Sequence, residues 1–519
     1  MTTENIIFIE EIAVILLLIA SGVAVAARRL RVPYTVGLVI IGLFITLLNP
    51  QHVEFTPQII MLLLVPPLVF EAAFHIRFDD LRHDFWLIML LAVPGVVLTT
   101  FLVGWLVSWG TGLALQAALV FGALIAATDP VAVVALFRRL GAPRRLQVLL
   151  ESESLLNDGT AIVMFGLMLM TALQGRFDLR QSISQFITVA GGGLVVGLVL
   201  GLSISQFIKR IDDPLVETTL TTALAFGSYL LAENLHVSGV LAVVMAGIIS
   251  GNTSQDTMSA STRLVVYNFW EYAAFIANSF IFLLIGLTID LNILFENWQA
   301  IGWAILAALV ARVVSTYGFS IFGREISSKW KHVLFWGGLR GAITLALALN
   351  LPESGIFIAE RGRLQAMAFG VVLFTLLVQG FSMDWLVKRL KLIVRSPAQD
   401  EYESRHARFV AGRAGYDYLR RRSMEGLISE HTWEKLSALM KKKNDMLMDE
   451  VKQVMTSEPE VEAEELETAY REALRAQRTA LSGLLHDGVI TEEIYSRLIS
   501  EVDEALMDKN HPRDWLNSG

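Results

Sequence analysis

Thirteen long apolar stretches follow one another along most of this chain, and they constrain its fold more than any other feature. A helix needs about 20 apolar residues to cross the hydrocarbon core of a bilayer, which is about 30 Å thick. We therefore predict an all-α, polytopic membrane protein with about thirteen transmembrane helices. The predicted spans are residues 6–27, 33–49, 56–75, 84–109, 113–137, 146–173, 184–208, 215–233, 236–252, 264–289, 297–323, 332–352 and 364–387.

The composition excludes a soluble globular enzyme. Hydrophobic residues make up 54% of the chain and charged residues 18%, and the mean hydropathy is +0.54. An ordinary soluble domain has about 45–50% apolar and about 25% charged residues. The chain contains no cysteine, which rules out disulfides, thiolate zinc sites, iron–sulfur clusters and a thiol nucleophile.

The net charge of −8 comes entirely from the last quarter of the chain. Residues 1–395 contain 25 acidic and 25 basic side chains, whereas residues 396–519 contain 25 acidic and 17 basic ones. We therefore predict a transmembrane domain over 1–395 and an acidic, helical cytoplasmic tail over 396–519. The tail holds two hairpin-like repeats, because GLISEHTWEKL at 426–436 parallels GVITEEIYSRL at 488–498. The tail could bind a regulator, support a dimer or do neither. Its acidic charge and the lack of a basic patch argue against nucleic acid as a binding partner.

Basic residues in the short connections between spans predict the orientation, because cytoplasmic connections carry the excess of Lys and Arg. With the N-terminus outside, the inner connections carry 19 basic residues and the outer ones carry 4. We therefore expect a multi-pass protein of the cell membrane, with its N-terminus outside and its C-terminus in the cytoplasm.

Acidic side chains inside the span 146–173 need a functional reason, because each one costs roughly 2.5–3.5 kcal/mol at a helix centre. Asp158 lies well inside this span and shares a helix face with Ser154, four residues earlier. Glu153 and Asn157 share the adjacent face. Hydroxyl, carboxylate and amide oxygens suit small, hard cations, so we predict a cation site here.

Two spans are predicted to be discontinuous. Pro130 disfavours helical geometry at Asp129, so the first break should lie near Thr128, Asp129 and Pro130. Such a break frees carbonyl groups and helix ends, which can hold ions where they line a cavity. Glycines at 337, 338 and 341, around Arg340, predict the second break.

The remaining intramembrane charges are predicted to play different parts. Buried Arg340 needs a carboxylate partner, and Glu153 is the first candidate. Glu71 lies near the inner end of the span 56–75 and is predicted to line the ion path. Structural pairs or charges at the mouth are the predicted roles of Glu217, Glu233, Glu271 and Arg312.

Four segments resemble the monovalent cation:proton antiporter-1 family, the bacterial and eukaryotic sodium/proton exchangers. They are LVPPLVFEAAF, AATDPVAVVALF, ESESLLNDGTAIV and FWGGLRGAI, and the resemblance covers most of residues 1–395. It implies a homodimer in which each protomer has a six-helix core domain and a dimerisation domain. It also implies inverted repeats whose two discontinuous helices cross at mid-membrane.

The resemblance also implies roles for individual residues. Asp158 would be the carboxylate that takes either a cation or a proton. The other residues implied at the cation or proton site are Asp129, Thr128 through its carbonyl, Ser154, Asn157 and Glu71. Glu153 and Arg340 would form a structural ion pair. The Asn157–Asp158 pair resembles the electroneutral branch of the family, which implies one sodium for one proton.

The predicted function is therefore antiport of sodium or lithium against protons, in pH homeostasis, by alternating access at a mid-membrane carboxylate and without a resident cofactor. A potassium/proton antiporter of the same fold stays open, because residue types alone do not determine selectivity. An ion channel is disfavoured, because the acids cluster at one depth around two broken spans. An enzyme is disfavoured because metal-spaced histidines, a nucleophile elbow and a phosphate-binding glycine loop are missing.

Overall fold

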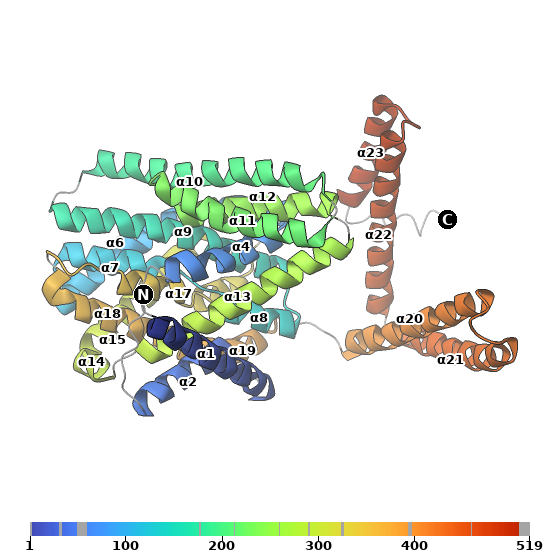
Figure 1. Ribbon diagram of the computed structural model, residues 1–519, viewed down its shortest axis with the longest axis horizontal. Coiled ribbons are helices and arrows are strands. Elements are labelled where there is room, and N and C mark those ends of the chain that lie inside the picture. Colours follow the sequence, from blue (N-terminus) through green and yellow to red (C-terminus); the bar gives the residue numbers. More distant parts are fainter. Residues whose placement is uncertain are drawn as a thin grey trace. The chain divides into compact units, whose positions relative to one another are not determined.

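A computed structural model shows a helical protein, with no strand among the residues that it describes (Figure 1). The chain divides into two compact units, Met1–Ile393 and Val394–Gly519. The predicted domain boundary after residue 395 lies at residues outside the described ones. The described residues are 3–30, 34–48, 60–175, 178–211, 213–258, 260–288, 291–322, 326–355, 357–392, 397–457 and 459–507.

The described part of the first unit consists mainly of helices, two of which are short π-helices labelled η. In chain order they are α1 (Thr3–Leu30), α2 (Tyr34–Leu48), η1 (Ile60–Leu64), α4 (Val65–His75), α5 (Phe78–Ala92), α6 (Pro94–Thr111), α7 (Leu115–Ala126), α8 (Val131–Leu140), α9 (Arg144–Gln174), α10 (Leu179–Ile208), α11 (Pro214–Asn234), α12 (Gly239–Thr257), α13 (Ala260–Thr288), α14 (Leu291–Glu296), α15 (Trp298–Phe319), α16 (Ser328–Trp336), α17 (Ala342–Leu349), α18 (Phe357–Phe374), η2 (Thr375–Gln379) and α19 (Gly380–Arg389).

These helices make the chain a multi-pass membrane protein. Eight helical segments of the described residues are long and apolar enough to cross a membrane, and four shorter ones are also apolar. Each of the thirteen predicted spans falls on one helix or on consecutive helices, whereas the short helix α14 was not predicted. The number thirteen itself stays a prediction. A few predicted end positions lie outside the described residues, namely 33, 49, 56–59, 289 and 323.

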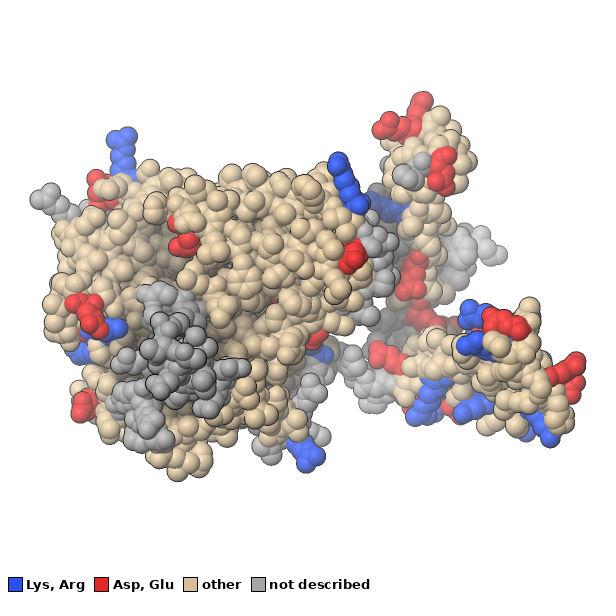
Figure 2. Space-filling view, in the orientation of Figure 1, with Lys and Arg blue, Asp and Glu red and all other residues tan. Residues whose placement is uncertain are grey.

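The surface of the first unit agrees with a lipid environment. Figure 2 shows a wide area of this unit almost free of charged side chains, with charges gathered toward its two ends. On α10, large apolar side chains such as Ile187 and Val199 are more than half exposed, at 63% and 55%. Exposed side chains of this kind are expected where a helix faces hydrocarbon.

Both predicted helix breaks are confirmed. Helix α7 ends at Ala126 and α8 begins at Val131, so Ala127–Pro130 is non-helical and Pro130 stands at the N-cap of α8. Helix α16 ends at Trp336 and α17 begins at Ala342, with the glycine-rich segment between them. Proline and glycine produce these breaks locally, as their backbone preferences require.

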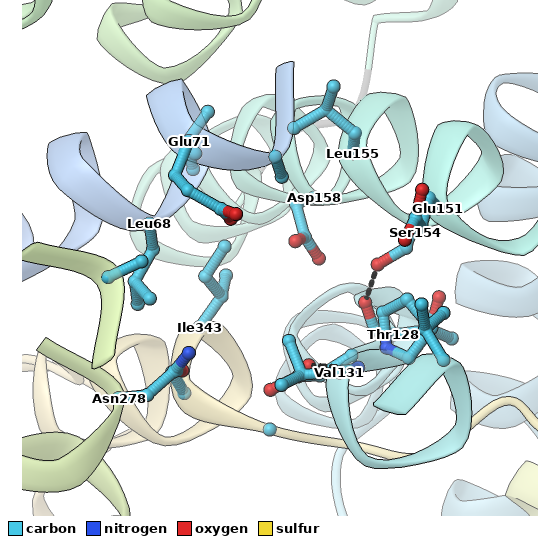
Figure 3. A pocket seen from close by; sticks show the side chains of 18 of the residues that line it. Leu68, Glu71, Thr128, Val131, Glu151, Ser154, Leu155, Asp158, Asn278 and Ile343 are labelled. Carbon is cyan, nitrogen blue, oxygen red and sulfur yellow. Dashed lines mark hydrogen bonds between the residues drawn. The ribbon is translucent and has the colours of Figure 1, made fainter. Parts of the chain in front are cut away.

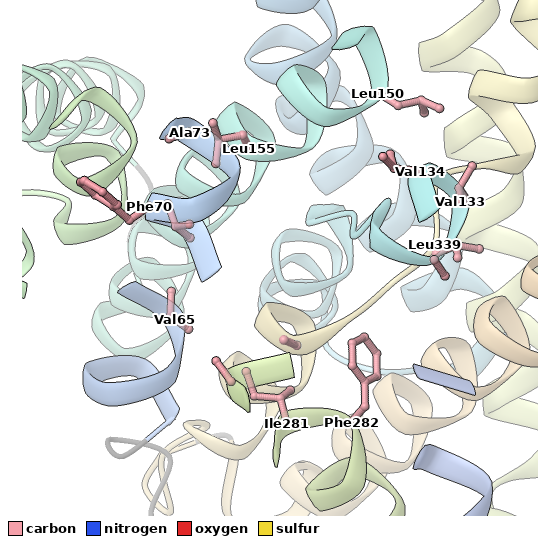
Figure 4. Packing of buried hydrophobic residues seen from close by; sticks show 14 of the residues in the cluster. Val65, Phe70, Ala73, Val133, Val134, Leu150, Leu155, Ile281, Phe282 and Leu339 are labelled. Carbon is pink, nitrogen blue, oxygen red and sulfur yellow. The ribbon is translucent and has the colours of Figure 1, made fainter. Parts of the chain in front are cut away.

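Buried apolar side chains hold α4, α8, α9 and α13 around the two breaks (Figure 4). Phe70 and Ala73 from α4 are fully buried, as are Leu339 within the second break and Phe282 from α13. Close packing of this kind places the polar residues of the breaks at fixed positions. The side chains labelled in Figure 4 are Val65, Phe70, Ala73, Val133, Val134, Leu150, Leu155, Ile281, Phe282 and Leu339.

In its described residues, the second unit contains four long helices that form two hairpins. Helix α20 (Pro397–Met424) packs on α21 (Glu430–Ser457), and α22 (Pro459–His486) packs on α23 (Glu492–Met507). The two turns have the same geometry, since Gly426 and Gly488 have φ values of 72° and 70°. This left-handed conformation is typical of the glycine that ends a helix. The repeat seen in the sequence thus corresponds to two turns of equal conformation.

The crossing of α2 and α13 depends on a glycine, and replacing Gly42 by alanine is expected to destabilise the protein. A Cβ atom there would lie 2.5 Å from the Leu283 carbonyl oxygen and 2.8 Å from Gly286 Cα. Overpacking of this kind costs about 1–3 kcal/mol. We expect Gly42→Ala to lower the melting temperature of the detergent-solubilised protein, followed by tryptophan fluorescence. The matched control is Gly22→Ala on α1, where no atom lies within 4 Å of the added Cβ; equal effects of the two changes would contradict the prediction.

Candidate functional site

The two helix breaks touch each other. The backbone N–H of Asp129, in the first break, donates a hydrogen bond to the Leu339 carbonyl in the second, at 2.8 Å. Four helix ends therefore meet near this point: the C-terminal ends of α7 and α16 and the N-terminal ends of α8 and α17. A helix N-terminus carries about half a positive charge and a C-terminus about half a negative one. The meeting point therefore needs charged side chains to balance these ends.

The Asp129 carboxylate lies at both positive helix ends. It accepts a hydrogen bond from the Val131 N–H at 3.1 Å, at the start of α8. It also accepts one from the Ala342 N–H, at the start of α17. Gly341 permits this approach, because a Cβ atom there would lie 2.6 Å from Asp129 Cγ. One aspartate thus stabilises two helix N-termini at once.

The Arg340 guanidinium lies at the negative end of α7. Its Nη1 donates to the Ala127 carbonyl at 3.1 Å and to the Ala126 carbonyl at 3.4 Å. Its backbone N–H donates to the Thr375 hydroxyl at 3.1 Å, where η2 begins. The Arg340 residue is 2% exposed, so these carbonyl groups supply the partners that a buried guanidinium requires.

The predicted Glu153–Arg340 pair is corrected by the structure, because Glu153 pairs with Arg312 of α15. Arg312 Nη1 donates to Glu153 Oε1, and Nη2 donates to Glu153 Oε2 at 3.2 Å. Arg312 Nη2 also donates to the Leu334 carbonyl at 2.9 Å, near the end of α16. Both side chains are buried, at 1% and 8% exposure. Arg340 faces α7 instead, whereas the prediction of a structural pair for Arg312 matches this geometry.

These contacts leave Asp158 in a distinct electrostatic position. Two arginines and two acids occupy the helix ends, so their formal charges cancel. Among the described residues, no basic side chain forms an ion pair with Asp158. Its carboxylate accepts a hydrogen bond from the Thr128 N–H, and Asp129 and Arg340 are its charged neighbours. A carboxylate in this position can gain a charge partner from a mobile cation or a proton.

Five of the predicted site residues line one cavity of about 460 Å³. Figure 3 shows the carboxylate of Asp158 between Glu71 on one side and Ser154 and Thr128 on the other. The hydroxyl of Ser154 donates to the Thr128 carbonyl. The five residues are Asp158, Asp129, Thr128, Ser154 and Glu71.

The other three predicted residues stand behind the cavity wall. Asn157 Nδ2 donates to the Thr128 hydroxyl at 3.2 Å, so the amide holds a residue of the first break in place. Glu153 and Arg340 do not line the cavity, and their contacts are with Arg312 and with α7. The ion-binding roles of Asn157 and of the five residues that line the cavity stay predictions.

The mouth of the cavity carries charges that the sequence assigned only in part. Arg138 Nη2 donates to Glu151 Oε1 at 2.8 Å, and these side chains are 58% and 20% exposed. Glu271 of α13 also lines the cavity, in agreement with its predicted role as a mouth charge or structural pair.

Two polar residues on the far wall were missed by sequence reasoning. Asn278 of α13 and Tyr34 at the start of α2 line the cavity and share a side-chain hydrogen bond. An amide within the apolar second half of α13 was the available signal at Asn278, which is 7% exposed.

The geometry is that of a secondary transporter, in which discontinuous helices bring ion-binding groups together inside the membrane. The family follows from comparison with known sequences. Residues 13–389 match the family described as sodium/hydrogen exchanger, transmembrane, and the chain belongs to this family of monovalent cation:proton antiporters.

Individual relatives agree with this membership. The chain is 42% identical to the Na(+)/H(+) antiporter ApNhaP of Aphanothece halophytica over 390 residues, which is 73% of this chain and 74% of that one. It is 34% identical to the Na(+)/H(+) antiporter NhaG of Bacillus atrophaeus over 516 residues, covering 95% and 97% of the two chains. The sodium proton antiporter MjNhaP1 of Methanocaldococcus jannaschii shares the fold, with a TM-score of 0.64 and 23% identity over 75% of this chain and 100% of that one.

The corrected ion pair generates a testable prediction. Removing one partner of a buried pair costs about 3–5 kcal/mol, because the other charge is left uncompensated. We expect Glu153→Ala and Arg312→Ala each to lower the melting temperature strongly, and the double variant to lose little more than either single one. Glu153→Ala and Arg340→Ala should lie closer to additivity, because Glu153 acts on Arg340 as a charged neighbour and forms no ion pair with it. Additive losses for Glu153 with Arg312, together with non-additive losses for Glu153 with Arg340, would restore the original pairing.

Proposed function

We propose that this protein is a sodium/proton antiporter of the cell membrane. The observation that carries the proposal is the position of Asp158, a carboxylate in a cavity at two adjacent helix breaks whose other charges balance one another. Family membership and relatives named as Na(+)/H(+) antiporters support it.

The cation site of the proposal consists of oxygen atoms. Asp158 takes either a cation or a proton, and the Thr128 carbonyl and the Ser154 hydroxyl supply neutral oxygens. Because the Ser154 hydroxyl donates to that carbonyl, its hydrogen has to turn away when a cation binds both oxygens. Asp129 and Glu71 add negative potential from opposite sides. Oxygen donors of this kind suit sodium and lithium.

Coupling follows from competition for one carboxylate. A sodium ion and a proton each neutralise Asp158, and only the neutralised site can move past the apolar barrier. A bare carboxylate would pay the desolvation cost of crossing, which traps the empty carrier on one side. Neither ion can then cross without exchange for the other. This is alternating access at a mid-membrane site.

The sidedness of the cavity follows from the distribution of basic residues. Its mouth lies at Arg138, in the connection assigned to the cytoplasm by its four basic residues at 138–145. The described conformation then faces the cytoplasm, with the N-terminus of the chain outside and the unit Val394–Gly519 in the cytoplasm. Assembly as a homodimer and binding of a regulator by that unit belong to the same proposal.

Replacing the central carboxylate tests the proposal. Asp158→Asn keeps the size of the side chain but removes the charge that sodium and protons share. We expect the variant to lose sodium/proton exchange by more than 100-fold in proteoliposomes with a pH-sensitive dye inside. The matched control is Glu353→Gln, because Glu353 is 79% exposed and lies away from the cavity. An Asp158→Asn protein that still exchanged sodium for protons would refute the mechanism.

The exchange ratio is tested with a membrane potential. Asn157 beside Asp158 contributes no charge, so one sodium replaces one proton and no net charge crosses. A potential then does no net work on the cycle, although each uncompensated charge would gain about 2.3 kcal/mol per 100 mV. We expect the sodium gradient that balances a given pH gradient to be the same with and without a valinomycin-clamped potential. A shift of this balance with voltage would exclude the one-for-one ratio.

A further inference from the structure

His75, the last residue of α4, contacts Glu71 twice through one nitrogen. Its Nδ1 lies 2.8 Å from the Glu71 carbonyl oxygen and 3.3 Å from Glu71 Oε1. A carbonyl oxygen only accepts hydrogen bonds, so Nδ1 carries the hydrogen and donates it. The Glu71 carboxylate oxygen Oε1 lies within ion-pair distance of the same nitrogen, so the Nδ1–H also faces the carboxylate.

Aromatic neighbours fix the plane of the His75 ring. Tyr267 of α13 packs edge-on against it, with ring centroids 4.8 Å apart and an interplanar angle of 76°. Phe74 packs in a similar way at 6.3 Å and 80°. A ring held on two sides keeps its Nδ1–H pointing at Glu71.

The Glu71 carboxylate needs such a support. Its side chain is 22% exposed and projects into the cavity toward Asp158 (Figure 3). Its other charged neighbours lie at the mouth, where Arg138 attracts the carboxylate and Glu151 and Glu271 repel it. Without the His75 contact, the flexible glutamate side chain would be free to leave its place opposite Asp158.

We infer that His75 is a positioning residue for sodium binding, which acts by holding the Glu71 carboxylate opposite Asp158. This inference rests on the proposed function. His75 supplies a fixed N–H that faces the Glu71 carboxylate at 3.3 Å, and Glu71 supplies the negative potential that the cation experiences. Sodium affinity depends on this contact, whereas the movement of the loaded site does not.

Three substitutions at His75 distinguish the contribution of the N–H donor from that of the aromatic ring. In asparagine, Nδ2 occupies the place of His75 Nδ1, so His75→Asn keeps the donor. His75→Gln moves the amide one bond further out, and His75→Ala removes it. All are measured in the full chain in proteoliposomes at one fixed pH, so that the proteins differ only in the side chain at this position.

We expect the KM for sodium to change and the maximal exchange rate to stay nearly constant. We expect His75→Ala and His75→Gln to raise the KM for sodium about five- to tenfold with a maximal rate within twofold of the parent protein. His75→Asn should restore the KM to within twofold of the parent. In a Glu71→Gln background, His75→Ala should change the KM no further. An unchanged KM in His75→Ala, no rescue by His75→Asn, or a falling maximal rate at constant KM would overturn the inference.

A binding measurement distinguishes this inference from the proposed function. Sodium should raise the melting temperature of the detergent-solubilised protein, because a ligand that binds the folded state stabilises it. The midpoint sodium concentration should rise five- to tenfold in His75→Ala and return in His75→Asn. If the parent protein does not exchange sodium for protons, the proposed function fails. If it exchanges but these midpoints are equal, only the role of His75 fails.

Discussion

The structure depends on the balance of charge where four helix ends meet. Asp129 lies at the two positive ends, Arg340 lies at one negative end, and Arg312 with Glu153 lies at the other. Helix ends are tolerated in a membrane only where their free backbone groups find partners. This balance allows two helices to be interrupted side by side, and the interruption exposes the Thr128 peptide to the cavity.

The helix ends are balanced internally, and among the described residues no basic side chain forms an ion pair with Asp158. The carboxylate lies in the cavity with the Thr128 N–H as a hydrogen-bond donor, and Ser154 lies one turn away on α9. Helices α4 and α13 form the opposite wall of the cavity. Glu71 projects from this wall, and we infer that His75 holds its carboxylate in place. The proposed competition between a cation and a proton requires such a site, in which one carboxylate can be neutralised from solution and its surroundings are fixed.

Much of the site could be predicted because its signals are local. The broken spans follow from Pro130 and from the glycines beside Arg340, and the shared face of Ser154 and Asp158 follows from their spacing of four residues. The partner of Glu153 could not be predicted in this way. Two arginines occur in apolar spans, and either one can reach a carboxylate, depending on how α15 and α17 pack against α9. Tyr34 was missed for the same reason, since it becomes informative only beside Asn278.

The amino-acid sequence by itself determined that this is a helical membrane protein with two interrupted spans. It also determined that acidic side chains lie inside the spans. Hydrophobic length, proline, glycine and helical spacing act within a few residues, so they can be read along the chain. Only the tertiary structure decided which arginine neutralises Glu153, which helix ends Asp129 serves, and that His75 supports Glu71 across from Asp158. These pairings depend on distances of a few ångström between helices far apart in the chain, and packing of the whole unit sets such distances.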